Sequence, residues 1–237
     1  MTLARLHRME VPFPVRLRRG LVAYWPLDEV SGTRRDVVGS NTLTDNNTVT
    51  QADGPSPWLP KAAQFTAANT EFLSITDNAA LSMGAGVRFT IALRVYFDSL
   101  PTVVDLLAKN AVAGTREYRI FKGSNHRVNL EVSSNGTAVA TAQSDFTLTT
   151  ATWYTIFAWY DGAFIGIQVD QTAPVRAAFT ADVVDGTTTF ILGKAAAGTN
   201  YHDGRMCDVP IWKTVLTEAE RRWWINNGSG RGLYPWA

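Results

Sequence analysis

The sequence has little of what would fix a fold covalently or place it in a membrane. Cys207 is the one cysteine among 237 residues, so no disulfide can form within the chain; we expect this thiol to be buried. No run of apolar residues approaches the roughly 18 that a membrane-spanning helix requires. The N-terminal residues are basic but lack the apolar run of a secretory signal peptide, so the sequence predicts none.

The chain also has almost no net charge. Its 22 Lys and Arg and 21 Asp and Glu give +1 at pH 7, which offers no argument for a nucleic-acid partner. Residues 1–19 nevertheless hold five arginines and one glutamate, and Pro12 and Pro14 exclude a helix around them. We therefore predict a basic extended arm over 1–19 that docks on another protein chain in an oligomer or larger assembly. The residues expected to make this assembly contact are Arg5, Arg8, Phe13, Arg16, Arg18 and Arg19, with Trp236 of the aromatic C-terminal tail.

Residues 20–237 are expected to form one domain made mainly of β-strands. Turn signals recur roughly every 8–12 residues, which is typical of a sandwich or barrel. Asn135-Gly136 predicts a type I′ hairpin turn with positive φ angles, and Asp161-Gly162 predicts a second hairpin. The predicted strands are 21–25, 89–97, 116–121, 127–132, 137–142, 153–160, 164–170, 188–193 and 206–212.

One helix is expected, close to the C-terminus. Thr217 and Glu220 have the spacing of a capping box, in which each residue satisfies the backbone N–H of the other. The helix is predicted to run to about Asn226 and to be ended by Gly228.

Several motifs follow one another in a fixed order over residues 20–235. They are LVAYWPLDEVSG at 21–32, AQF at 63–65 with FLSI at 72–75, FTIA at 89–92, WY at 153–154 with WYDG at 159–162, and GRMCD at 204–208 with IWK at 211–213 and LTEAE at 216–220. In this order they resemble the laminin G-like branch of the concanavalin A-like lectin/glucanase superfamily. The resemblance implies an all-β, two-sheet antiparallel jelly-roll sandwich with one short C-terminal helix. It also implies glycan binding, protein binding or adhesion, with some glycosidases in the superfamily and similar domains in bacteriophage virion proteins.

No catalytic site is predicted. The glucanases of this superfamily carry their carboxylates as E-x-D-x-E or E-x-D-x-x-E on one strand, and none of the seven glutamates begins that pattern. Glu218 and Glu220 are two residues apart on the predicted helix, where such positions point apart. Zinc-ligand spacing is absent from the three histidines, His7, His126 and His202.

Calcium is the cofactor that the loops favour, because it prefers hard oxygen ligands. The candidate ligands lie beside strand ends and are Asp28, Asp36 and Asp203. The alternative for Asp28 and Asp36 is a turn closed by side-chain hydrogen bonds to the backbone. Trp58 and Tyr201 lie in loops and are predicted to stack on a sugar or a partner. The tryptophans within strand patterns are expected in the core, namely Trp25, Trp153, Trp159 and Trp212.

Three functions are compatible with these features. The favoured hypothesis is a non-enzymatic virion-surface protein (a decoration, fibre or tail-associated protein) that adheres through a lectin-like jelly roll and docks through its N-terminal arm. The alternative is a free or secreted carbohydrate-binding lectin module. A glycoside hydrolase is the least favoured, because the carboxylate pattern is missing. The first two place the protein on a virion surface or outside the cell.

Overall fold

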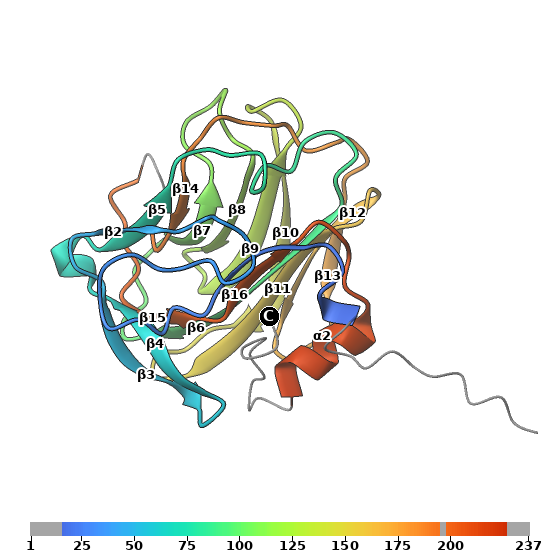
Figure 1. The fold of residues 1–237 in the computed structure, drawn as a ribbon. Helices are drawn as coiled ribbons and strands as arrows, with labels where there is room; N and C mark the ends of the chain where they lie inside the picture. Colours follow the sequence, from blue (N-terminus) through green and yellow to red (C-terminus); the bar gives the residue numbers. More distant parts are fainter. Residues whose placement is uncertain (1–15, 195–197, 227–237) are drawn as a thin grey trace, which may run out of the picture.

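Two antiparallel β-sheets pack face to face around one main hydrophobic core (Figure 1). The structure is a computed structural model, and it describes residues 16–194 and 198–226. It confirms the expected all-β, two-sheet jelly-roll sandwich with a short C-terminal helix. Over these residues, no helix combines the length and the apolar character needed to cross a membrane.

The nine-stranded sheet carries the long strands β6 and β11 near its centre. Its main path runs β13-β12-β11-β6-β15-β4-β3, and β16 pairs with both β1 and β6. The strands are β1 Leu21–Trp25, β3 Thr50–Ser56, β4 Leu59–Phe65, β6 Phe89–Phe97, β11 Trp153–Tyr160, β12 Phe164–Val169, β13 Val175–Ala178, β15 Gly204–Cys207 and β16 Val209–Trp212.

The seven-stranded sheet runs β10-β9-β8-β7-β14-β5-β2. A short 3-10 helix, η1 Ala67–Asn69, precedes β5. The strands are β2 Thr44–Asn46, β5 Phe72–Ile75, β7 Val104–Lys109, β8 Tyr118–Lys122, β9 Arg127–Ser133, β10 Val139–Thr147 and β14 Phe190–Leu192.

Alternate residues of each strand fill the space between the sheets, as strand geometry requires. In the seven-stranded sheet, Tyr118, Ile120 and Leu130 point inward and are fully buried. Arg119 and Glu131 alternate with these inward residues along β8 and β9. They pair with each other across the two strands and point away from the core. This pattern fixes the register, because a slip of one residue would turn the charged side chains into the core.

Helix α2, Glu218–Ile225, packs on the nine-stranded sheet through a second apolar cluster. Trp224 is fully buried and makes an edge-to-face contact with Trp212 at 5.4 Å between ring centroids. The predicted capping box is confirmed, since Glu220 N donates to Thr217 Oγ1 at 3.3 Å and Thr217 N donates to Glu220 Oε2 at 2.7 Å.

The helix ends at Ile225, which agrees with the predicted end at about Asn226, but a different residue caps it. Asn226 adopts the left-handed conformation with φ 45° and donates its backbone N–H to the Arg222 carbonyl. Asn tolerates this conformation better than most residues. It therefore provides the cap that was expected of Gly228, which lies outside the described residues.

Residues 16–19 are not extended, so that part of the arm prediction is wrong. Arg16 and Leu17 are helical, and a turn leads from them into β1. Leu17 is fully buried, and its carbonyl accepts a 2.6 Å hydrogen bond from Trp212 Nε1. The folded unit thus begins before residue 20, because an apolar anchor fixes the chain there.

The Asn135-Gly136 hairpin is present, but its predicted type I′ turn is wrong. The last strand pair is Ser133 with Val139, which leaves 134–138 as the connection. Gly136 has φ 79°, whereas Asn135 is not among the residues with positive φ. Instead, Asn135 Oδ1 accepts the backbone N–H groups of residues 137 and 138 at 2.9 and 2.8 Å, which closes a longer turn.

The predicted continuous strand 206–212 is interrupted at Asp208. This residue has φ 57°, and it separates β15 from β16. Both strands pair with β6, but β15 continues to β4 and β16 continues to β1. The break buries the Asp208 carboxylate against Arg94, at 2.8 Å between Nε and Oδ2.

Candidate functional site

Outward-facing residues form a continuous row across the seven-stranded sheet. The registers of adjacent strand pairs line them up at the strand spacing of about 4.8 Å. The row comprises Thr44, Ser74, Ile191, Ala108, Arg119, Glu131 and Thr141. A neighbouring row adds Asp105, Phe121, Asn129 and Gln143. We call these two rows together the outer face.

Arg119 of β8 organises the polar part of the outer face. Its Nε and Nη2 donate to Glu131 Oε1 and Oε2 at 3.0 and 2.9 Å, and its Nη1 donates to Asp105 Oδ1 at 3.3 Å. The guanidinium also stacks on the Phe121 ring, 4.1 Å from the ring centroid. Asn110 Nδ2 adds a 3.1 Å bond to Glu131 Oε1. A two-pronged arginine–carboxylate contact of this kind holds both planar groups in one orientation.

Asp105 is the least satisfied member of this group. It is only 3% exposed, and its Oδ2 has no hydrogen-bond partner. Burial raises the pKa of Asp105 to about 6, because it penalises the charged carboxylate more than the nearby Arg119 stabilises it. A buried carboxylate that changes charge near pH 6 is a common feature of binding and catalytic sites.

An aromatic group lies further along the same sheet. Phe72 of β5 alternates with the core residue Leu73 and therefore faces outward. Its ring lies 6.3 Å from the ring of Tyr201, and Lys194 Nζ lies 4.7 Å from the Phe72 ring and 5.1 Å from the Tyr201 ring. Three strand spacings separate β5 from β8, so this group lies roughly 14 Å from Arg119.

The two predicted stacking residues are not brought together. Trp58 is 72% exposed in the turn between β3 and β4, whereas Tyr201 is half-buried near the opposite end of β4. The length of β4, six steps of about 3.3 Å, sets them roughly 20 Å apart. Tyr201 is therefore the one of the two that lies beside the outer face.

The three predicted calcium ligands do not share a site. Asp36 accepts backbone N–H groups at both carboxylate oxygens, including Tyr24 at 2.9 Å and Asn41 at 3.2 Å, which is the turn alternative. Asp203 accepts from the Ser99 hydroxyl at 2.6 Å, and the backbone carbonyl of Asp28 accepts from a glutamine side chain. Within 16–194 and 198–226, no three His, Cys, Asp or Glu side chains are grouped as metal ligands.

Most of the other predicted positions lie in the interior. Cys207 is fully buried, and burial raises the pKa of its thiol. His202 is also fully buried, and burial lowers the pKa of its imidazole to about 4, so this residue is a neutral core histidine. Of the strand tryptophans, Trp153 is half-buried, and the three that are buried as expected are Trp25, Trp159 and Trp212.

The remaining predicted contact residues divide in two. Arg5, Arg8, Phe13 and Trp236 lie outside the described residues, so their assembly role stays a prediction. Arg16, Arg18 and Arg19 are exposed at the turn that precedes β1.

A second polar region lies between the β12–β13 turn and helix α2. It is a hollow of about 600 Å³ whose charged members, Glu218 and Arg222, pair with each other at 2.6 Å. The other lining residues are Gln168, Gln171, Thr172, Ala173 and Pro174. Among the residues that the structure describes, no aromatic side chain lines this hollow, which makes it a poorer surface for stacking than the outer face.

Sequence reasoning missed Asp105, Arg119 and Glu131. The signal was the alternation of polar and apolar residues in β8 and β9, which places Arg119 and Glu131 on the outward side. Asp105 gave no such signal, since residues 104–107 read Val-Asp-Leu-Leu and a bulge disturbs the alternation there.

Comparisons with known proteins agree with the architecture. A laminin G family model, described as the concanavalin A-like lectin/glucanases superfamily, matches residues 68–220. No curated protein matches the chain by sequence at a significant level.

Several solved structures share the fold. The binding domain of Paraclostridial Mosquitocidal Protein 1 superimposes with a TM-score of 0.73 at 13% identity, over 88% of this chain and 52% of that one. Domain 4 of AbnA, an extracellular GH43 arabinanase from Geobacillus stearothermophilus in complex with arabinotriose, gives 0.65 at 18% identity, over 85% of this chain and 96% of that domain. The Trypanosoma rangeli sialidase superimposes with a TM-score of 0.64 at 13% identity, over 89% of this chain and 33% of the sialidase. The chain thus spans about half of the first structure and a third of the third.

Proposed function

Because the chain belongs to the concanavalin A-like lectin/glucanases superfamily, we propose that it is a non-catalytic carbohydrate-binding module whose ligand lies on the outer face. The observation that carries this proposal is the Arg119 group, in which planar polar side chains are fixed beside an aromatic ring. Carbohydrates offer hydroxyls that donate and accept hydrogen bonds, together with apolar C–H faces that stack on aromatic rings. Fixed polar groups set orientation and specificity in such sites.

The length of the outer face favours an oligosaccharide over a monosaccharide. The Arg119 group and the Phe72–Tyr201 group lie roughly 14 Å apart along the sheet. The likeness to the AbnA domain, whose structure contains arabinotriose, supports a short glycan chain as the ligand class.

We propose a non-catalytic module because Arg119 holds the carboxylates of both Glu131 and Asp105. Both oxygens of Glu131 accept hydrogen bonds from Arg119, so neither is directed at a ligand as a proton donor. Asp105 also binds Arg119, through Oδ1. Two carboxylates tied to one guanidinium do not form the separated acid and base that glycoside hydrolysis uses.

Glycan-array screening, followed by calorimetric titration with the best ligand, tests the proposal. We expect Arg119→Ala and Tyr201→Ala each to weaken binding at least tenfold. Arg127→Ala is the matched control, because Arg127 lies on β9 of the same sheet but pairs only with the exposed Asp145 at 3.4 Å. Loss of binding in Trp58→Ala alone would instead place the ligand at the β3–β4 turn. Release of reducing sugar by the purified protein would show that the module is catalytic.

A second candidate function is a virion-surface protein that docks through the N-terminal arm. The exposed cluster Arg16, Arg18 and Arg19 favours it, since the buried Leu17 presents these charges from a fixed turn. Removal of residues 1–15 combined with Arg16→Ala, Arg18→Ala and Arg19→Ala leaves Leu17 in place, so we expect a folded domain that no longer joins the particle. Unchanged incorporation of the truncated chain would argue against this role.

A further inference from the structure

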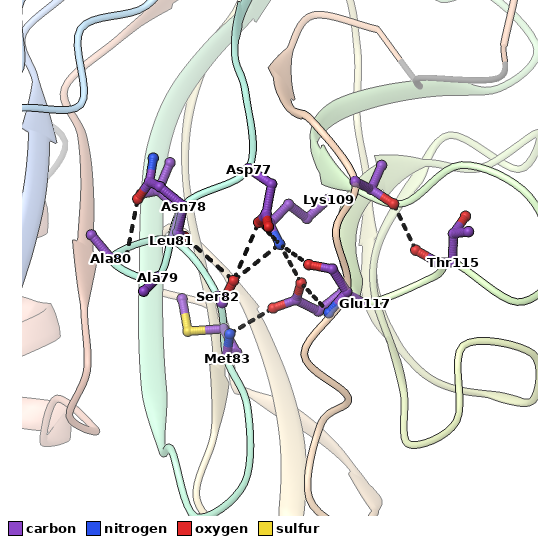
Figure 2. Close-up of polar contacts among 12 residues, drawn as sticks. Asp77, Asn78, Ala79, Ala80, Leu81, Ser82, Met83, Lys109, Thr115 and Glu117 are labelled. Atoms are coloured by element: carbon purple, nitrogen blue, oxygen red, sulfur yellow. Dashed lines mark hydrogen bonds and ion pairs between the residues drawn. The ribbon is translucent and has the colours of Figure 1, made fainter.

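Three charged side chains meet inside the protein near the end of β7 (Figure 2). Lys109 Nζ lies 2.6 Å from Glu117 Oε2 and 2.7 Å from Asp77 Oδ1. The side chains of Lys109 and Glu117 are fully buried, while that of Asp77 is 31% exposed. Lys109 ends β7, Glu117 immediately precedes β8, and Asp77 follows β5. The carboxylates of Asp77 and Glu117 therefore come from separate parts of the chain and meet at Lys109 Nζ.

The surrounding chain holds these groups in place. Glu117 Oε1 accepts the Met83 backbone N–H at 2.5 Å, and Glu117 Oε2 accepts that of Gly186 at 3.1 Å. Lys109 Nζ also donates to the Gly186 carbonyl at 2.7 Å and contacts Ser82 Oγ at 3.2 Å. Lys109 and Glu117 are thus held together, and the Ser82 hydroxyl also donates to Asp77 Oδ1 at 3.4 Å.

We propose that Lys109 and Asp77 condense into an intramolecular isopeptide bond, with Glu117 as the group that moves the proton. Glu117 takes a proton from the Lys109 ammonium, and the freed lone pair attacks Asp77 Cγ. The Nζ–Cγ bond forms and one Cγ–O bond breaks. Two protons of the ammonium leave with that oxygen as water, one of them by way of Glu117. An ammonium and a carboxylate become one neutral amide and one water, and Glu117 returns to its starting state.

Proximity and burial are the forces that favour the reaction. Reacting groups held in contact reach effective concentrations of order 10⁵–10⁸ M, which offsets the tendency of water to hydrolyse an amide. Burial raises the pKa of Glu117, which suits a group that must accept and return a proton. The amide replaces two charges that are costly to keep in the interior. Its N–H can keep the bond to the Gly186 carbonyl, and the exposed side of Asp77 gives the released water a way out.

A lysine–aspartate ion pair on the surface provides a comparison for the buried contact between Lys109 and Asp77. Lys61 Nζ lies 3.0 Å from Asp53 Oδ1, but the side chains are 43% and 85% exposed. Within the described residues, Lys61 pairs with no second carboxylate. We expect this pair to remain an ordinary ion pair, and it serves as the internal control.

The test is the intact mass of the purified full-length protein after prolonged incubation. The expected mass is lower than the sequence mass by one water, and proteolysis should yield one branched peptide that joins Lys109 to Asp77. Asp77→Ala and Glu117→Gln should both have their full sequence masses. Asp77→Asn should lose ammonia instead of water and reach the same final mass as the wild type.

Each contrary result overturns the inference. A wild-type mass equal to the sequence mass means that the contact is only an ion pair. A water loss that persists in Asp77→Ala has another origin, such as ring closure at one of the Asp-Gly sequences. A branched peptide from Lys61 and Asp53 would show that contact alone is sufficient and that Glu117 has no role. The wild-type measurement decides the question even where a variant fails to fold.

Discussion

Asp105→Asn removes a carboxylate whose burial should make the protein less stable as the pH rises. The folded state raises the pKa of Asp105 from 3.8 to about 6, so between these values the folded state binds more protons than the unfolded one. Stability then falls with increasing pH across this window. A shift of about two units corresponds to roughly 3 kcal/mol at 1.36 kcal/mol per unit, fully present below pH 4 and lost above pH 6.

The assay is urea unfolding of the wild type and Asp105→Asn from pH 3.5 to pH 8. Asn keeps an oxygen for Arg119 but places an N–H₂ group where Oδ2 has no partner, which adds a cost that does not depend on pH. The informative quantity is therefore the change with pH. The free energy of unfolding of the variant, relative to the wild type, should rise by about 3 kcal/mol between pH 4 and pH 7.

The opposite slope would refute the reasoning. If the attraction of Arg119 outweighed burial, the pKa of Asp105 would lie below 3.8 and the wild type would gain stability as the pH rose. The carboxyl ¹³C shift of Asp105 gives an independent measurement, and its titration midpoint should lie near 6. Arg119→Ala should move that midpoint higher still, because it removes the positive charge that opposes the shift.

Three further substitutions test the packing of the nine-stranded sheet and of helix α2. Arg94→Met leaves the fully buried Asp208 without its 2.8 Å partner and should cost about 3–5 kcal/mol in urea unfolding. Thr217→Ala removes the cap of α2 and should cost about 1 kcal/mol, with Thr217→Ser as the neutral comparison. In Gly166→Ala, the new Cβ would lie 2.2 Å from the Trp159 ring, so we expect a loss of about 1–3 kcal/mol and a changed tryptophan fluorescence.

The strands that the sequence predicted best are runs rich in aliphatic and aromatic residues. The predicted ranges 21–25, 89–97 and 153–160 coincide with β1, β6 and β11. The short edge strands β2 and β13 escaped prediction, because three or four residues carry too little periodicity to separate a strand from a loop. Asp208 was misread for a different reason, since its left-handed backbone depends on its buried partner Arg94 and not on any local turn residue.

The candidate site was less accessible to sequence reasoning than the fold. Tyr201 was predicted from its loop composition, but its neighbours Phe72 and Lys194 are contributed by β5 and by the second residue after β14. Arg119 and Glu131 lie twelve residues apart and meet only because β8 and β9 pair in that register. A single sequence shows that each residue is polar and outward, but the pairing of distant strands decides which of them are neighbours.

A bulge in β7 explains why Asp105 and Lys109, four residues apart in one strand, lie on opposite sides of the sheet. Asp105 faces outward beside Arg119, whereas Lys109 faces the interior beside Glu117. Asp105 pairs with Phe121 and Leu107 pairs with Ile120, so Leu106 is an added residue that forms a bulge. In a regular strand that kept all six residues, positions 105, 107 and 109 would share a face, and Lys109 would point outward with Asp105. With the bulge, Lys109 falls opposite Tyr118 on the core side, where it meets Glu117 and Asp77. The outward position of Asp105 and the buried position of Lys109 therefore both depend on this local irregularity, which no alternation pattern in residues 104–109 reveals.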